Sequence, residues 1–145
     1  MIKTILTVIV VLAFIGVGGF VYLGQSSKNG SAPGLANGAL APCPESPNCV
    51  SSEEGTAGDK RVDPLPVDIW DELPAAIEGM DGVIIVSGES YIAAEFTSAT
   101  FGFVDDLELR KADDLVHIRS ASRVGYSDGG MNAKRVAELS SRIGK

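Results

Sequence analysis

The sequence predicts an α+β fold, in which an N-terminal transmembrane helix and a linker precede a four-stranded antiparallel sheet with two helices packed on one face. Three observations predict this fold. Residues 4–24 contain no charged side chain, and all 7 prolines lie between Pro33 and Pro74. From residue 68 onward, four strand-like segments lie between two segments of helical periodicity.

The uncharged segment 4–24 is long enough to cross a membrane as a helix. Its 21 residues, at about 1.5 Å of rise per residue, span a hydrocarbon core of about 30 Å. A cleaved signal peptide and a buried core helix are the alternatives. We favour an uncleaved signal anchor over residues 1–24, because the apolar region of a secretory signal is shorter, about 7 to 15 residues, and ends in a small-x-small cleavage site.

The rest of the chain divides into a linker and one domain. Residues 25–41 are mainly Gly, Ser, Asn and Ala, a composition typical of a flexible linker. Residues 42–145 are expected to form a small globular α+β domain. Its Pro- and Cys-rich lead-in, up to residue 66, should be loop-rich and lie over the domain.

The two cysteines, Cys43 and Cys49, are separated by five residues in the string PCPESPNCV. The prolines and the Ser-Pro-Asn turn favour a closed loop, and a disulfide there would contribute about 2 kcal/mol. Free buried thiols are one alternative. A zinc site is another, but zinc prefers four N or S ligands, and His117 is the only histidine. We favour the disulfide, which would place the domain in an oxidising compartment outside the cytoplasmic membrane.

Two helices and four strands are predicted after residue 66. The first helix has four apolar residues on one face: Trp70, Leu73, Ile77 and Met80. Asp68 is its expected N-cap, and Pro74 predicts either a kink or an irregular first turn. The strands are expected at residues 82–87, 90–97, 100–111 and 115–123, and the short turns between them predict an antiparallel meander.

The last helix is expected at about residues 129–143. Its apolar face contains Met131, Val136, Leu139 and Ile143. Ser127 or Asp128 is expected to cap its first turn.

Asp105 and Asp106 should point to opposite faces of the third strand, with Asp105 on the apolar face. A buried carboxylate needs a partner. One interpretation is a structural ion pair between either aspartate and Arg119 or Arg123. The other is a polar pocket at the start of the last helix, where Arg123 and the helix N-terminus would face an anionic ligand. Asp128 weakens the second interpretation, because its own carboxylate can occupy the free amides.

The charge distribution excludes one class of partner. A net charge of -7, from 12 basic and 19 acidic residues, makes nucleic-acid binding improbable. Acidic residues dominate positions 45–114, and basic residues dominate positions 115–145. Either the fold cancels this asymmetry internally, or the basic end forms a patch for an acidic protein or anionic lipid headgroups.

The sequence offers little support for catalysis. By strand parity, His117 lies opposite Ser120 and Ser122, which argues against a Ser-His pair. No phosphate-binding loop, dinucleotide fingerprint or metal motif occurs. We therefore expect no metal and no cofactor.

Three strings resemble a known family: CPESPNCVSS at residues 43–52, FGFVDDLELR at residues 101–110, and HIRSASRVGYSDGGMN at residues 117–132, with Arg135 just after. Together they closely resemble the bacterial and plant family catalogued as domain of unknown function 1499 (DUF1499), over about residues 40–143. The resemblance implies no activity, because the family has none established. It does imply that a set of residues belongs to the family pattern: Cys43, Cys49, Asp105, Asp106, Arg119, Ser120, Ser122, Arg123, Gly125, Asp128, Asn132 and Arg135. Lys60 and its neighbours depart from the pattern, since relatives often have a histidine there.

The resulting hypothesis is a single-pass protein of the inner (cytoplasmic) membrane, anchored through residues 4–24, with its domain on the periplasmic or extracytoplasmic side. The domain is expected to bind an envelope protein or an anionic lipid or ligand. The candidate binding residues are Asp105, Asp106, Arg119, Ser120, Ser122, Arg123, Asp128, Asn132 and Arg135. One alternative is an envelope hydrolase or lipid-modifying enzyme that uses Asp105 or Asp106 with Arg123 and Ser120. A purely structural envelope protein is the other.

Overall fold

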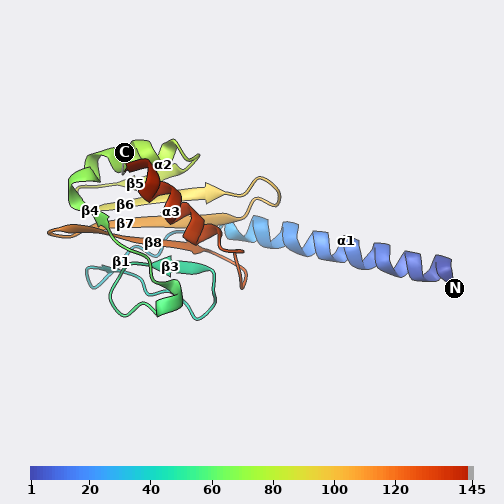
Figure 1. The fold of residues 1–145 in the computed structure, drawn as a ribbon. Helices are drawn as coiled ribbons and strands as arrows, with labels where there is room; N and C mark the ends of the chain where they lie inside the picture. The colour runs from blue at the N-terminus through green and yellow to red at the C-terminus, as the bar shows by residue number, and fades with distance from the viewer. Residues whose placement is uncertain (144–145) are drawn as a thin grey trace.

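The fold is that of a computed structural model, in which residues 1–143 are described (Figure 1). The helices are α1 (Ile2–Ser27), α2 (Leu73–Glu78) and α3 (Met131–Ile143), with short 3-10 helices at Gly58–Lys60 and Val67–Glu72. The strands are β1 (Leu35–Ala36), β2 (Ala39–Leu40), β3 (Cys49–Ser51), β4 (Leu65–Pro66), β5 (Val83–Ser87), β6 (Tyr91–Thr97), β7 (Val104–Lys111) and β8 (Leu115–Ser122).

The main sheet has six strands, whereas the sequence predicts four. Strands β5 to β8 form the predicted antiparallel meander. The two further strands, β3 and β4, both pair antiparallel with the outer edge of β8. They come from the predicted lead-in, and at three and two residues they are too short for alternation of apolar residues to reveal them. A separate two-stranded hairpin is formed by β1 and β2.

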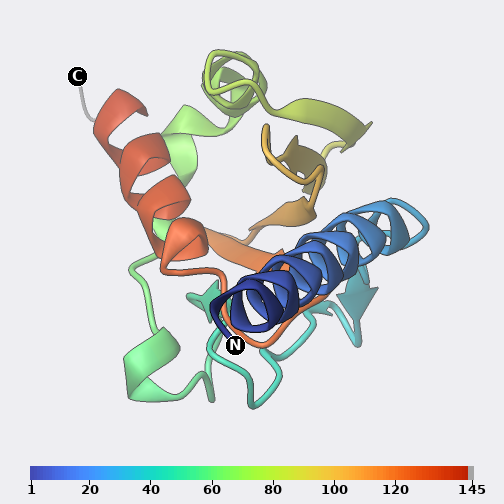
Figure 2. The same cartoon turned by 90° about the vertical axis from the view of Figure 1, so that its right-hand side faces the viewer.

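Both domain helices cover the same face of the sheet (Figures 1 and 2). The hydrophobic core lies between them and the strands. It includes Leu73 and Ile77 of α2, Leu139 of α3, and Leu107 and Leu109 of β7, all with no exposed surface. This matches the predicted helical and strand faces, because burial of those apolar stripes is what holds the two layers together.

The predicted first helix is divided in two. A 3-10 helix at Val67–Glu72 precedes α2, and Pro74 lies in the first turn of α2, where its missing N–H costs no hydrogen bond. The irregular first turn is therefore the correct alternative, and the kink is not. The expected N-cap at Asp68 is wrong, because the 3-10 helix directly follows β4 and leaves Asp68 inside its first turn.

The third strand begins at Val104, four residues later than predicted. A tight turn occupies residues 98–103 instead, closed by the bond from the Ser98 N–H to the Phe103 carbonyl. Gly102 adopts a φ of 69° in this turn, a left-handed conformation that favours glycine.

Helix α1 is long and apolar enough to cross a membrane, as judged by its length and composition. Its C-terminal end is built into the domain. The buried hydroxyl of Ser27 accepts a hydrogen bond of 2.9 Å from the Val104 N–H, and the Ser27 carbonyl accepts one of 3.2 Å from Arg123 Nη1. Farther back along the helix, the ring of Phe20 stacks on Phe101 with 5.3 Å between centroids.

Residues 25–41, predicted as a linker, contain the end of α1 and the β1–β2 hairpin. Leu40 of this segment is buried, and the Gly34 N–H donates to Glu108 Oε1 on the sheet face opposite the helices. The boundaries between anchor, linker and domain stay a prediction.

Candidate functional site

The sheet separates the predicted site residues into two sets. Asp105, Ser120 and Ser122 point toward α2 and α3, because they share the parity of the core residues of β7 and β8. Asp106, Arg119 and Arg123 point to the opposite face. The sequence therefore places Asp105 and Asp106 correctly on opposite faces.

The set on the helix side forms one polar network, which we call the helix-side network. Its members are Asp105, Ser120, Ser122, Asp128, Asn132 and Arg135. Arg135 Nη2 donates to Asp105 Oδ2 at 2.8 Å, and Arg135 Nη1 donates to the Ser120 hydroxyl at 2.9 Å. The Ser120 hydroxyl in turn donates to Asn132 Oδ1 at 2.7 Å. Arg135 also lies over the ring of Phe96, 4.5 Å from its centroid.

The partner of Asp105 differs from the prediction. Arg119 and Arg123 were the expected partners, but strand parity directs both away from Asp105. Arg135 reaches it instead from the first turns of α3. Only the packing of α3 on the sheet brings these two side chains together.

Asp128 caps α3, as expected. Its two carboxylate oxygens accept hydrogen bonds from the N–H groups of Gly130, at 2.9 Å, and Asn132, at 2.7 Å. The carboxylate thus occupies the amides that the anionic-ligand interpretation requires, which removes the geometric basis for an anion site at this helix end.

The opposite face carries three ion-paired groups, which we call the outer networks. In the first, Arg123 donates two hydrogen bonds to Asp106, at 2.8 and 2.6 Å, and a further one to Glu95. Asp106 is 3% exposed. The hydrogen bonds to Asp106 raise the pKa of Arg123 above its ordinary value, so the guanidinium stays charged. The predicted ion pair of Asp106 with Arg123 is confirmed.

The second outer network is centred on Glu108, which has no exposed surface. Its carboxylate accepts hydrogen bonds from Arg119 Nη1 at 2.8 Å and from the Tyr91 hydroxyl at 2.7 Å. Burial, and then the bond to Glu108, raise the pKa of Tyr91 well above its ordinary value. Arg119 Nε is buried and has no hydrogen-bond partner within residues 1–143.

The third outer network joins Glu53, Arg110 and His117. Arg110 donates to both oxygens of Glu53, at 2.8 and 3.0 Å, and His117 Nδ1 lies 3.7 Å from Glu53 Oε2. Burial by itself raises the pKa of Glu53. The hydrogen bonds from Arg110 and from the Leu40 N–H, with the charges of His117 and Arg110, outweigh burial and hold this pKa below its ordinary value.

Part of the charge asymmetry of the sequence is cancelled internally. Arg119, Arg123 and Arg135 of the basic C-terminal part pair with Glu108, Asp106 and Asp105 of the acidic part. These arginine side chains are less than one-tenth exposed. They therefore do not form a free basic patch.

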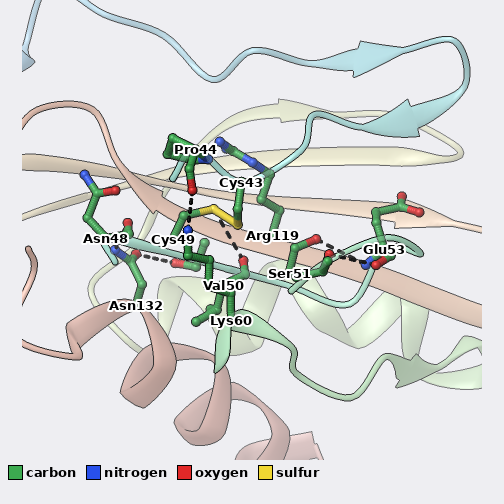
Figure 3. Close-up of a disulfide and its surroundings, with 12 residues drawn as sticks. Cys43, Pro44, Asn48, Cys49, Val50, Ser51, Glu53, Lys60, Arg119 and Asn132 are labelled. Atoms are coloured by element: carbon green, nitrogen blue, oxygen red, sulfur yellow. Dashed lines mark hydrogen bonds between the residues drawn. A yellow bond between two sulfur atoms is a disulfide. The ribbon is translucent and has the colours of Figure 1, made fainter. Parts of the chain in front are cut away.

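The disulfide between Cys43 and Cys49 is present (Figure 3). The disulfide closes a loop, and Asn48 in this loop binds it to the rest of the domain. The Asn48 side-chain amide donates to the Gly125 carbonyl at 2.8 Å, and the Asn48 carbonyl accepts a bond of 3.0 Å from Asn132 Nδ2. Lys60, at the departure from the family pattern, donates to the Glu45 carbonyl across the same loop.

A groove of about 870 Å³ opens beside this loop, between the β1–β2 hairpin and the start of β8. Glu53, Arg110 and His117 line it together with Lys60 and Leu40. His117 lies 3.4 Å from the Ser52 hydroxyl, but Ser52 is buried and already accepts the Ile118 N–H at 2.9 Å. The groove thus presents charged groups without an accessible nucleophile beside the histidine.

The residues of the predicted enzyme site do not converge. Asp106 and Arg123 lie on the outer face, whereas Asp105 and Ser120 lie beneath α3. In the part of the chain that the structure describes, no three His, Cys, Asp or Glu side chains are placed to hold a metal ion.

Several residues of these networks were missed in the sequence. Glu108 and Arg110 share the parity of Asp106, so alternation along β7 was a usable indication for them. No such alternation in the sequence indicates a role for Glu53, Asn48 or Glu95. They reach the networks only through the pairing of β3 with β8 and of β6 with β7.

Comparison with known proteins gives one match. A family model described as "Protein of unknown function (DUF1499)" matches residues 39–143. No curated protein and no solved structure matches the chain. The matched region contains both cysteines and every predicted binding residue, and it excludes α1.

Proposed function

The chain belongs to the DUF1499 family, whose description names no function, and from the geometry we propose that it is a single-pass membrane protein of the cell envelope with an extracytoplasmic binding domain. The anchor is α1, through residues 4–24. The cytoplasmic membrane is the membrane it spans. The domain lies on the periplasmic or extracytoplasmic side.

The observation that carries the proposal is the insertion of the end of α1 into the domain. Ser27 is 1% exposed. Its hydroxyl accepts a hydrogen bond from the Val104 N–H, and its carbonyl accepts one from Arg123 Nη1. Cleavage after Ser27 would remove both acceptors and leave the two donors without these partners, at a cost of about 1–3 kcal/mol each. Cleavage within α1, before Ser27, would keep the acceptors but remove most of the helix that holds Ser27 in place. Both consequences favour an uncleaved anchor.

The disulfide supports the placement of the domain outside the cytoplasm, because disulfides persist in oxidising compartments. The groove supports a binding role. Two of its lining residues, Arg110 and His117, lie at the end of the sheet away from α1, whereas Val104 and Arg123 lie at the end where α1 enters. The groove therefore faces away from the membrane, toward polar components of the envelope.

The location is tested with the full chain in its native host. Non-reducing mass spectrometry should recover Cys43 and Cys49 in one disulfide-linked peptide, and membranes washed with alkaline carbonate should retain the protein. A reporter enzyme that is active only after export should be active when fused after Lys145. Two free thiols, or an inactive reporter of normal abundance, would contradict the proposal.

The binding role is tested by photocrosslinking in the same membranes. A photoreactive amino acid at Glu54, an exposed residue of the groove, should capture an envelope component, and His117→Gln should weaken the capture. The matched control is the same amino acid at Ser141, an exposed residue of α3. Equal capture at both positions, or capture that is insensitive to His117→Gln, argues against the groove as the site.

A further inference from the structure

A second cavity, of about 360 Å³, lies where α1 enters the domain. It is distinct from the groove. Half of its lining residues have large apolar side chains, namely Phe20, Leu23, Phe103, Val124, Tyr126 and Met131. The other half are Gly125 and the polar residues Ser98, Asp105, Ser122, Ser127 and Asp128. Its volume lies within the range of about 300–1,000 Å³ that is usual for small-molecule sites. Two of its lining residues belong to α1 itself, so the cavity opens beside the surface of the predicted membrane anchor.

The apolar residues around this cavity are unusually exposed for the domain. Tyr126 is 76% exposed and Met131 is 51% exposed. Both lie in or just after the loop between β8 and α3, which lines the cavity together with Ser98 and Phe103 of the turn at residues 98–103. Large exposed apolar side chains that cluster on one face mark a surface for a partner or a membrane.

The attachment of α1 fixes the height of this face above the membrane. The uncharged segment of α1 ends at Gly24, and a side-chain carbon added to Gly24 would lie 1.9 Å from the Phe101 carbonyl oxygen. Helix and domain therefore touch where the apolar segment ends, and Ser27, one turn later, is hydrogen-bonded into the sheet. No flexible spacer separates the membrane span from the turn at residues 98–103.

This geometry sets the environment of the two loops. If about 20 residues of α1 cross the hydrocarbon core, the C-terminal end of the helix lies at the lipid headgroups. Tyr126 then lies at the depth where tyrosine side chains are enriched in membrane proteins. The cavity wall formed by Phe20 and Leu23 becomes continuous with the lipid-facing surface of α1.

We infer that this cavity receives an acyl chain of a membrane phospholipid from the adjacent leaflet. The inference rests on the proposed membrane anchorage. A lipid tail is the apolar group closest to the cavity mouth, and its entry would remove the apolar walls from water. The domain is then seated on the bilayer through its loops as well as through α1.

The test uses the full chain reconstituted in phosphatidylcholine vesicles that contain a phosphatidylcholine with a photoreactive acyl chain. After irradiation, peptides of the β8–α3 loop should carry lipid adducts in addition to those on α1. Met131→Trp places a bulky ring in the cavity and should lower the loop adducts roughly fivefold. The matched control is Leu115→Trp, at an exposed apolar residue of the opposite sheet end, which should leave them unchanged.

The outcomes separate the two proposals. Vesicle flotation before irradiation tests the anchor, and a chain that does not float with the vesicles contradicts the proposed function itself. A chain that floats but carries adducts only on α1 overturns the lipid site alone. Met131 is half exposed, so its replacement should leave the domain folded. Circular dichroism of both variants checks this, because each carries a second tryptophan and fluorescence would no longer report on Trp70 alone.

Discussion

Arg123 joins three parts of the molecule at one point. It bonds to Asp106 on the neighbouring strand, to Glu95 one strand farther on, and to the Ser27 carbonyl at the end of α1. Its side chain is 6% exposed. A guanidinium in this setting stabilises the fold mainly by preventing a buried carboxylate from being left unpaired.

We therefore expect Arg123→Gln to lower the free energy of unfolding by about 3–5 kcal/mol, because Asp106 loses its charged partner. Denaturant titration of the full chain in detergent, followed by the fluorescence of Trp70, measures the change. The matched control is Arg142→Gln on α3. Arg142 pairs with Glu138 at 2.8 Å, but both side chains are about half exposed, so the loss should stay within about 0.5 kcal/mol. Similar losses in the two variants would contradict a structural role for Arg123.

Glu53 makes the stability of the folded protein depend on pH. Its pKa in the folded protein is lowered from 4.5, so the stability that it contributes is complete above that value and is lost as pH falls through the folded-state pKa. We expect Glu53→Gln to destabilise the protein at pH 7. The difference from the unmodified chain should shrink as pH falls below 4.5 and through the lowered pKa of the folded state. Thermal melts at several pH values measure it, and a constant difference down to pH 2 would be the contrary result.

At the scale of elements, the C-terminal turn of α1 determines how the helix and the domain are joined. The sequence around it is rich in small polar residues and predicts a flexible linker. The structure instead forms hydrogen bonds through Ser27 and a close backbone contact at Gly24. Neither contact can be predicted from the composition of this segment, because each is made with the β6–β7 turn or the residue after it, more than 70 residues away in the sequence.

Gly24→Ala should loosen this junction, because the added carbon would overlap the Phe101 carbonyl. Gly18→Ala is the matched control, since a side-chain carbon at Gly18 meets nothing within 4 Å. Both changes raise helix propensity equally, by about 1 kcal/mol. Hydrogen exchange should therefore become faster at the Val104 N–H only in Gly24→Ala. Equal exchange in both variants would show that α1 is not held by this contact.

The lead-in to the domain shows the same limit of sequence patterns. Residues 42–66 were expected to be loops over the domain, and their prolines and turns are compatible with that expectation. Yet β3 and β4 in this segment complete the sheet at the open edge of β8. Strands of two or three residues form there because β8 offers unpaired N–H and carbonyl groups, not because their own sequences favour extended structure.

At the scale of the whole molecule, the disulfide is the one covalent link that fastens the lead-in. Replacing both Cys43 and Cys49 by Ser should lower the free energy of unfolding by about 2 kcal/mol, since a short loop is no longer closed in the unfolded chain. Reductant should destabilise the unmodified chain by a similar amount and leave the double variant unaffected. Equal stability of the oxidised chain and the double variant would show that Asn48 and the pairing of β3 suffice to hold the loop.

The arrangement of charge is also a property of the whole molecule. An acidic body and an arginine-rich end, taken as sequence, allow either internal pairing or a basic binding patch. The structure pairs Arg119, Arg123 and Arg135 within the domain. What the outside of the molecule offers instead is the charged groove at one end and the apolar cavity beside α1 at the other.

The sequence by itself determined the features that depend on near neighbours: the apolar segment, the meander and the faces of its strands. It narrowed the helix cap to Ser127 or Asp128 and favoured the disulfide over free thiols. Tertiary structure alone decided that Asp105 meets Arg135, that Glu53 meets Arg110, that the sheet has six strands and that α1 ends inside the domain. The physical reason is that parity and periodicity fix the direction of a side chain. The identity of its partner depends on which distant segment packs against that face, and this is settled only when the whole core is buried.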